Sequence, residues 1–67
     1  MNSHQIGANL QRARKKLNLT QAQLAIKVGV HPNWYARLER GEEKPSLKTL
    51  EKIAKVLHMK SSDILSF

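Results

Sequence analysis

The sequence of 67 residues contains no cysteine, few aromatic residues and no long apolar run. Without cysteine the chain forms neither disulfide bonds nor thiolate metal sites. No run of apolar residues exceeds three, whereas a helix that spans a membrane needs about 20. Residues 1–7 also lack the basic and apolar segments of a signal peptide. We therefore expect a cytoplasmic protein without a membrane partner.

Acidic residues are also scarce. Five Asp and Glu residues stand against 12 Lys and Arg residues, which gives a net charge of +7. Seven of the basic residues and one of the acidic residues lie in residues 1–40, so this part carries +6 and residues 41–67 carry +1. An excess of this size favours nucleic acid as the partner, bound mainly by the N-terminal part of the chain.

Apolar residues recur every three or four positions, which is typical of helices with one buried face. The first such stripe consists of Ile6, Leu10, Ala13 and Leu17. Further helices are predicted at about residues 20–28, 32–40 and 46–57, the last with an apolar face that starts at Leu47, and a short apolar segment follows at 61–67. The chain shows no strand pattern. We predict an all-α, compact bundle of five short helices that forms one domain over residues 1–67.

Capping residues mark the ends of the second and third helices. Thr20 and Gln23 have the spacing of a capping box, and Gly29 suits the left-handed position after a helix. Pro32 suits the first helical position, because the N–H that it lacks would be unpaired there. Two short helices joined by a three-residue turn that contains glycine form a helix-turn-helix, here at about residues 20–39.

The second helix of this unit carries residue types that suit a DNA groove. Arginine can bond guanine through two N–H groups, and asparagine can bond adenine in the same way. Asn33 and Arg37 therefore are candidates for base reading. The alternatives are a solvated arginine and an asparagine that bonds only its own helix start. Trp34 either lies beside the DNA or closes the edge of the core.

In four segments the chain resembles the phage repressor/Cro (XRE-type) family of helix-turn-helix DNA-binding regulators. The segments are Thr20-Gln21-Ala22-Gln23-Leu24-Ala25, Val28-Gly29-Val30, Arg37-Leu38-Glu39-Arg40-Gly41 and Pro45-Ser46-Leu47. The resemblance covers about residues 6–65. It implies that the helix at about 32–40 enters the major groove of double-stranded DNA, while the helix at 20–28 crosses above the backbone.

The resemblance also implies roles for single residues. A structural ion pair between Arg14 and Glu39 would tie the first helix to the recognition helix. Base reading falls to His31, Asn33 and Arg37, and contact with the DNA backbone falls to Gln21, Trp34, Arg40 and Lys44. A helix N-terminus, such as that at Gln21, suits a phosphate.

The sequence departs from the family pattern at several of these positions. His31 stands where the family usually has a capping Ser or Thr, and Pro32 replaces a side chain that usually reads a base. Glu42 and Glu43 lie in a loop that is often basic, so phosphate contact there is less expected. His58 stands where a glycine often ends the fourth helix.

Neither a metal site nor an active site is expected, and no cofactor is implied. His4, His31 and His58 are 27 residues apart each time, without the close spacing of metal ligands. The segment Ser61-Ser62-Asp63 follows His58, but we interpret it as a helix start rather than as part of a nucleophile set. The protein is therefore expected not to be an enzyme.

These observations predict a sequence-specific transcriptional regulator, in the first instance a repressor, that acts at the nucleoid. One recognition helix covers only a few base pairs, so we expect a homodimer on a pseudo-palindromic operator with half-sites roughly 34 Å apart. Ile64, Leu65 and Phe67 are the candidate dimer surface, or else they cap the monomer core. Three alternatives remain: activation through polymerase, an antitoxin that binds a toxin, and a protein-interaction module without specific DNA readout.

Overall fold

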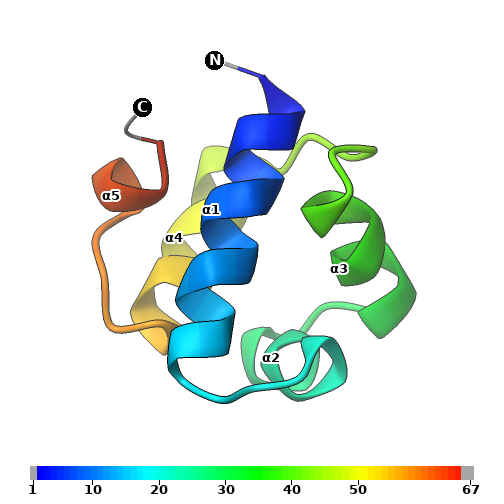
Figure 1. Cartoon of the computed structure of the whole chain (residues 1–67), viewed down its shortest axis with the longest axis vertical. Coiled ribbons are helices and arrows are strands. Elements are labelled where there is room, and N and C mark those ends of the chain that lie inside the picture. Colours follow the sequence, from blue (N-terminus) through cyan, green and yellow to red (C-terminus); the bar gives the residue numbers. More distant parts are fainter. Residues whose placement is uncertain (1, 66–67) are drawn as a thin grey trace.

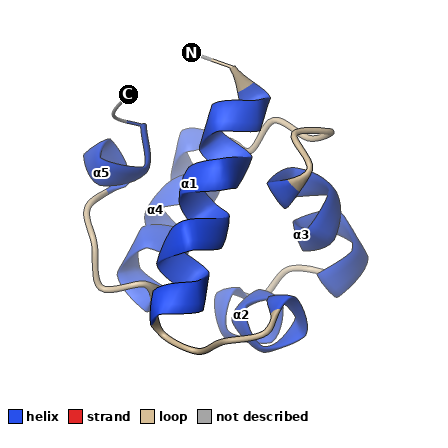
Figure 2. Ribbon diagram, in the orientation of Figure 1, coloured by secondary structure: helices blue, strands red, loops and turns tan. Residues whose placement is uncertain are grey.

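The computed structural model describes residues 2–65, which form five α-helices. In chain order these are α1 (Ser3–Lys16), α2 (Gln21–Val28), α3 (Pro32–Glu39), α4 (Leu47–Val56) and α5 (Ser61–Leu65). Figure 2 shows no strand among the described residues, so the predicted all-α class with five helices is confirmed. No helix in this part of the chain is long and apolar enough to cross a membrane.

The helices surround one apolar core. Helix α1 crosses the middle of the molecule, with α5 on one side and with α2 and α3 on the other (Figure 1). Helix α3 packs against both α1 and α2, α4 packs against α2 and α5, and α5 also packs against α1. Because two helices contact α3 from different directions, its orientation relative to the rest of the molecule is fixed.

Apolar side chains from all five helices, together with the residue that follows α4, form the core. They are Ile6, Leu10, Leu24, Ala25, Tyr35, Leu38, Leu50, Ile53, Ala54, Leu57 and Ile64. Each fully buried large side chain in such a core contributes about 1.5–3 kcal/mol to folding. The predicted stripes are confirmed except at Leu17 and Leu47, which are 40% and 59% exposed. Both lie at a helix end, where no neighbouring helix covers them, and the prediction that they are buried was wrong.

The last described helix belongs to the core of the monomer. Ile64 is fully buried, and its carbonyl oxygen accepts a hydrogen bond of 2.7 Å from the side-chain amide of Asn9 in α1. Of the two alternatives for Ile64, a place in the monomer core is confirmed and a place on a dimer surface is wrong, because its own chain covers the side chain. The side chain of Leu65 and the residue Phe67, named with it for that surface, lie outside the described residues.

The helix ends follow the local capping chemistry. Gln23 N donates to Thr20 Oγ1 at 3.0 Å and Thr20 N donates to Gln23 Oε1 at 2.8 Å, so the predicted capping box is formed. Gly29 follows α2 with a φ of 89°. His58 takes the corresponding left-handed conformation after α4, with a φ of 58°. A residue with a side chain is strained there, which is the reason that glycine is common at such a position.

Candidate nucleic-acid interface

Helices α2 and α3 form the helix-turn-helix, joined by residues 29–31. Leu24 and Ala25 of α2 and Tyr35 and Leu38 of α3 are buried, so both helices direct their apolar faces into the core. The opposite face of α3 is free for contact with other molecules. His31, Asn33 and Arg37, the three candidates for base reading, are all exposed. Asn33 and Arg37 are four residues apart, which places them on the same side of the helix.

His31 is both the cap of α3 and a member of its exposed face. Its Nδ1 accepts a hydrogen bond of 3.1 Å from Asn33 N, so the histidine satisfies one of the free N–H groups at the helix start. Since Nδ1 is the acceptor, the neutral ring carries its proton on Nε2. This leaves Nε2 of His31 as a donor that a base or a phosphate can use.

A buried ion pair lies behind the recognition helix. Arg14 Nε is 2.7 Å from Glu39 Oε2 and Arg14 Nη2 is 3.1 Å from Glu39 Oε1, a side-on geometry with two parallel bonds. The third nitrogen, Nη1, donates to the carbonyl oxygen of Leu19 at 2.7 Å. The side chain of Glu39 is only 2% exposed. The pair therefore joins the end of α1, the start of α2 and the end of α3.

Gln21 belongs to the same network. Its Nε2 donates to Glu39 Oε1 at 2.9 Å, so the side chain is held against α3 rather than extended into solvent. Burial raises the pKa of Glu39, but hydrogen bonds, led by that from Arg14, outweigh burial and hold the pKa below its ordinary value. The hydrogen bond to Glu39 likewise raises the pKa of Arg14. Nothing in the sequence indicated this partner of Gln21.

The hydroxyl group of Tyr35 is buried beside this network. It makes no hydrogen bond of ordinary geometry within the described part of the chain. Burial is the main cause that raises the pKa of Tyr35 above its ordinary range. The phenol therefore stays protonated and acts as a core side chain with an unpaired polar atom.

The two arginines on the outer side of α3 are paired with acidic residues of the loop that follows. Arg40 Nε is 2.7 Å from Glu42 Oε2 and Arg40 Nη2 is 3.2 Å from Glu42 Oε1. Arg37 Nε is 3.2 Å from Glu43 Oε2. The hydrogen bond from Arg40 lowers the pKa of Glu42. Both glutamates depart from the family pattern in the sequence, but their partners depend on the geometry of the loop.

The remaining candidates for backbone contact lie on either side of this face. Trp34 is half-buried and packs against the core, so only part of the indole can reach another molecule. Lys44 is exposed in the loop before α4, beside Pro45 and Leu47. The structure therefore places the candidates for base reading together on α3, with those for backbone contact at the start of α2, on α3 and in the loop.

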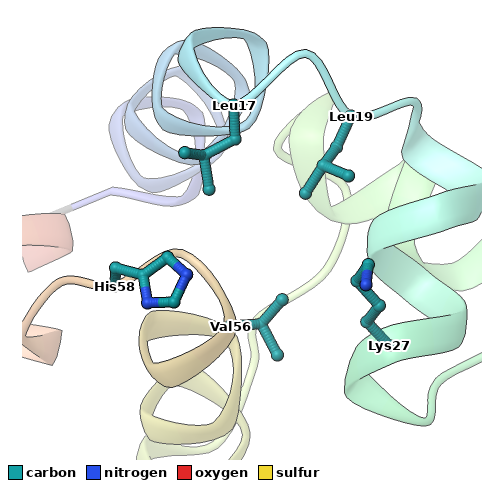
Figure 3. Close-up of a pocket in the computed structure, with 5 residues that line it drawn as sticks. All are labelled: Leu17, Leu19, Lys27, Val56 and His58. Carbon is teal, nitrogen blue, oxygen red and sulfur yellow. The ribbon is translucent and has the colours of Figure 1, made fainter.

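An open groove lies between the C-terminal ends of α1, α2 and α4. Leu17, Leu19 and Val56 supply its apolar lining, and Lys27 and His58 supply two basic groups (Figure 3). None of these lining residues carries a carboxylate, hydroxyl or thiol group. Among the described residues, no group of three His, Asp or Glu side chains is arranged to hold a metal ion.

Comparisons with known proteins agree with this geometry. A family model described as helix-turn-helix matches residues 10–65. An uncharacterized HTH-type transcriptional regulator of Archaeoglobus fulgidus is 46% identical over 54 residues, which cover 81% of this chain and 76% of the relative. The immunity repressor protein of Bacillus phage phi105 is 38% identical over 60 residues, which cover 90% of this chain but only 42% of that repressor.

Solved structures show the same fold. SinR, the master regulator for biofilm formation, has been solved in complex with DNA and superposes on this chain with a TM-score of 0.87 at 31% identity, covering 91% of this chain and 98% of that one. A chain of the complex between the proteins SinR and SinI matches with the same TM-score and identity, covering 91% of this chain and 60% of that one. Together with the family model, these findings confirm the resemblance in the sequence: the chain belongs to the phage repressor/Cro (XRE-type) helix-turn-helix family of DNA-binding transcriptional regulators.

Proposed function

We propose that this regulator is a non-enzymatic repressor that reads an operator by inserting α3 into the major groove of double-stranded DNA. The observation that carries the proposal is the exposed face of α3. It presents His31, Asn33 and Arg37 on a helix whose other side is fixed by a buried core and by the Arg14–Glu39 pair. A recognition helix held rigidly from behind presents its side chains to the bases with little further ordering.

The roles of the side chains follow from their hydrogen-bonding groups. Asn33 can bond adenine and Arg37 can bond guanine, each through two hydrogen bonds. His31 Nε2 donates to a base edge or a neighbouring phosphate. Phosphate contacts would set the register of the domain on the duplex without reading sequence. We assign these to the second amide N–H of Gln21, to Trp34, to Lys44 and to Nη1 of Arg40, which has no hydrogen-bond partner in the part of the chain that the structure describes.

We further propose that the regulator binds as a homodimer, because one recognition helix covers only a few base pairs. Two copies on a pseudo-palindromic operator place their recognition helices about 34 Å apart, on one side of the duplex. Repression would follow from occupancy of the operator. The name of the phi105 relative, an immunity repressor, supports this sign of regulation.

Selection of bound duplexes from a random DNA library, at about 150 mM salt, tests the proposal. We expect a palindromic motif with half-sites one helical turn apart. Asn33→Ala should lose the base preference at one base pair, and Arg37→Ala should lose it at another. Each lost contact between side chain and base should reduce the discrimination there by about 1–3 kcal/mol. Lys52→Ala, which removes a charge from the exposed side of α4, is the matched control and should keep the motif. Recovery of no motif with the unaltered protein would overturn the proposal.

A protein partner is the second candidate. SinR has been solved with SinI as well as with DNA, so a protein of this fold can bind both. A toxin or polymerase that docks on this chain would belong to this class. An interaction module would keep its partner in Arg37→Ala, whereas an operator-binding regulator would lose its site preference. The same variant therefore separates the two candidates.

A further inference from the structure

The two arginines on the outer side of α3 are held by carboxylates in different ways. Glu42 contacts Arg40 side-on and uses both Nε and Nη2, so among the described residues Nη1 of that guanidinium has no hydrogen-bond partner. Glu43 forms only an ion pair with Arg37, whose Nε is 3.2 Å from Glu43 Oε2, and among the described residues no hydrogen bond joins the two side chains. In the described part of the chain, no hydrogen bond engages Nη1 or Nη2 of Arg37. The Nε group of Arg37 is thus paired with a carboxylate, while the outer end of the side chain is open.

The open end is the part of Arg37 that can read a base. Guanine presents two acceptors, O6 and N7, in the major groove, and a pair of N–H groups on one guanidinium can bond both. A carboxylate on Nε leaves the Nη1 and Nη2 groups together as such a pair. It also limits the number of rotamers that a long, exposed arginine samples before DNA binds.

The carboxylate is itself well placed to act as a restraint. The N–H of Glu42 donates to the carbonyl oxygen of Arg37 at 2.9 Å, and the N–H of Gly41 donates to that of Leu38 at 3.1 Å. These two bonds tie the start of the loop to the last turn of α3. Glu43 follows directly, and its side chain is 32% exposed. The carboxylate is therefore anchored on the same rigid element as the arginine that it contacts.

From this geometry we propose that Glu43 is a positioning residue that determines specificity: it directs the outer end of Arg37 toward guanine at one base pair of the operator. The proposal rests on the proposed function of α3 as the recognition helix. The negative charge of Glu43 near the DNA backbone lowers the affinity for every sequence. Only a duplex with guanine at that base pair regains the lost affinity, through its contact with Arg37. Glu43 thereby increases discrimination rather than affinity.

Glu42 provides a matched control, because it lies in the same loop and carries the same charge but contacts Arg40. Glu43→Gln and Glu42→Gln each remove one negative charge from an exposed site, so the fold should survive both. The measured quantity is the ratio of the affinities for the selected operator and for a duplex changed at the base pair where Arg37→Ala loses preference. Both affinities are measured at about 150 mM salt.

We expect Glu43→Gln to reduce this ratio about tenfold, a loss within the range that one good arginine–guanine contact contributes. Glu42→Gln should raise both affinities and leave the ratio unchanged. In the Arg37→Ala background, Glu43→Gln should have no further effect on the ratio, because the side chain that it positions is absent. Glu43→Asp, whose shorter side chain keeps the charge, should restore part of the discrimination.

Two results would overturn the proposal while the proposed function stands. In the first, Glu43→Gln raises both affinities and keeps the ratio, as expected for Glu42→Gln, so the carboxylate acts only through its charge. In the second, Glu43→Gln reduces the ratio by the same factor in the Arg37→Ala background, so the carboxylate does not act through Arg37. Failure of the unaltered protein to select any motif is a different outcome, since it overturns the proposed function and the role of Glu43 with it.

Discussion

Gly7 of α1 lies against the carbonyl oxygen of Glu39 at the end of α3 so closely that a Cβ atom at Gly7 would be 2.3 Å from that oxygen. The carbonyl oxygen of Leu38 would be 2.7 Å away. Both neighbours are backbone atoms in a helix, which cannot turn aside as a flexible side chain can. The absence of a side chain at Gly7 therefore sets the distance between α1 and the recognition helix.

Gly7→Ala should destabilise the protein, although the same change in an exposed part of a helix stabilises it by up to about 1 kcal/mol. The crowding against α3 is an overpacking strain, which typically costs about 1–3 kcal/mol. A thermal unfolding curve decides between the two effects by the sign of the change in Tm. Gln5→Ala, at an exposed position two residues earlier, is the control and should leave Tm within a few degrees. A raised Tm for Gly7→Ala would contradict the close approach.

Tyr35→Phe should leave the free energy of unfolding unchanged or raise it. The ring of Tyr35 is fully buried, but its hydroxyl makes no hydrogen bond of ordinary geometry in the described part of the chain. Loss of an unpaired buried hydroxyl removes a desolvation penalty of about 1–3 kcal/mol without opening a large cavity. Urea denaturation measures the change. A loss of more than about 1 kcal/mol would mean that the hydroxyl has a partner, with the nearby Arg14–Glu39 network the first place to look.

Much of the fold could be predicted because it depends on residues close together in the chain. The box of Thr20 and Gln23 and the cap Ser46 each act within three positions. Periodicity alone identified the buried faces, and it failed at Leu17 and Leu47, where the helix ends leave the side chain uncovered. At Ile64 the pattern could show an apolar residue but not which surface covers it.

The candidate site was less predictable because its side chains come from different elements. The resemblance to a known family implied the Arg14–Glu39 pair, but nothing in the spacing indicated that Gln21, 18 residues before Glu39, donates to the same carboxylate. The contact between Arg37 and Glu43 depends on the path of the loop and on two rotamers. A run of two acids after a recognition helix is the only sequence signal that could have suggested it.

The buried ion pair should make stability depend on pH in the acid range. The pKa of Glu39 is lower in the folded protein than its ordinary value of 4.5, so folding favours the ionised form. The stabilisation is therefore complete above about pH 4.5 and is lost as the pH falls below it through the folded pKa. Urea midpoints between pH 3 and pH 7 measure the loss. In Glu39→Gln, the part of the slope that Glu39 contributes should disappear.

Removal of one partner of this ion pair should lower the free energy of unfolding more than protonation of Glu39 at low pH does. Arg14→Ala leaves the carboxylate of Glu39 buried without its main partner, which typically costs about 3–5 kcal/mol. A chain of this size has little stability to spare, so most of the variant should be unfolded at room temperature. Arg12→Ala, at an exposed position of the same helix, should behave like the unaltered protein. Equal stability of the two variants would show that the ion pair is replaceable.

Two substitutions in the loop before α4, at Lys44 and Glu42, should change DNA affinity through charge and should act in opposite directions. If about six phosphates are neutralised, the logarithm of the affinity falls with the logarithm of the salt concentration at a slope near −5. Lys44 is exposed and should supply one of these contacts. Lys44→Ala should therefore weaken binding to every sequence equally and reduce the size of the slope by about 1. Glu42→Gln should do the reverse, because it releases Arg40 from its carboxylate and makes a further cation available for a phosphate.

Titrations of labelled operator and of unrelated duplex at several salt concentrations measure both slopes. Unchanged slopes in both variants would mean that this loop lies away from the DNA backbone, and the phosphate contacts would then have to come from α2 and α3.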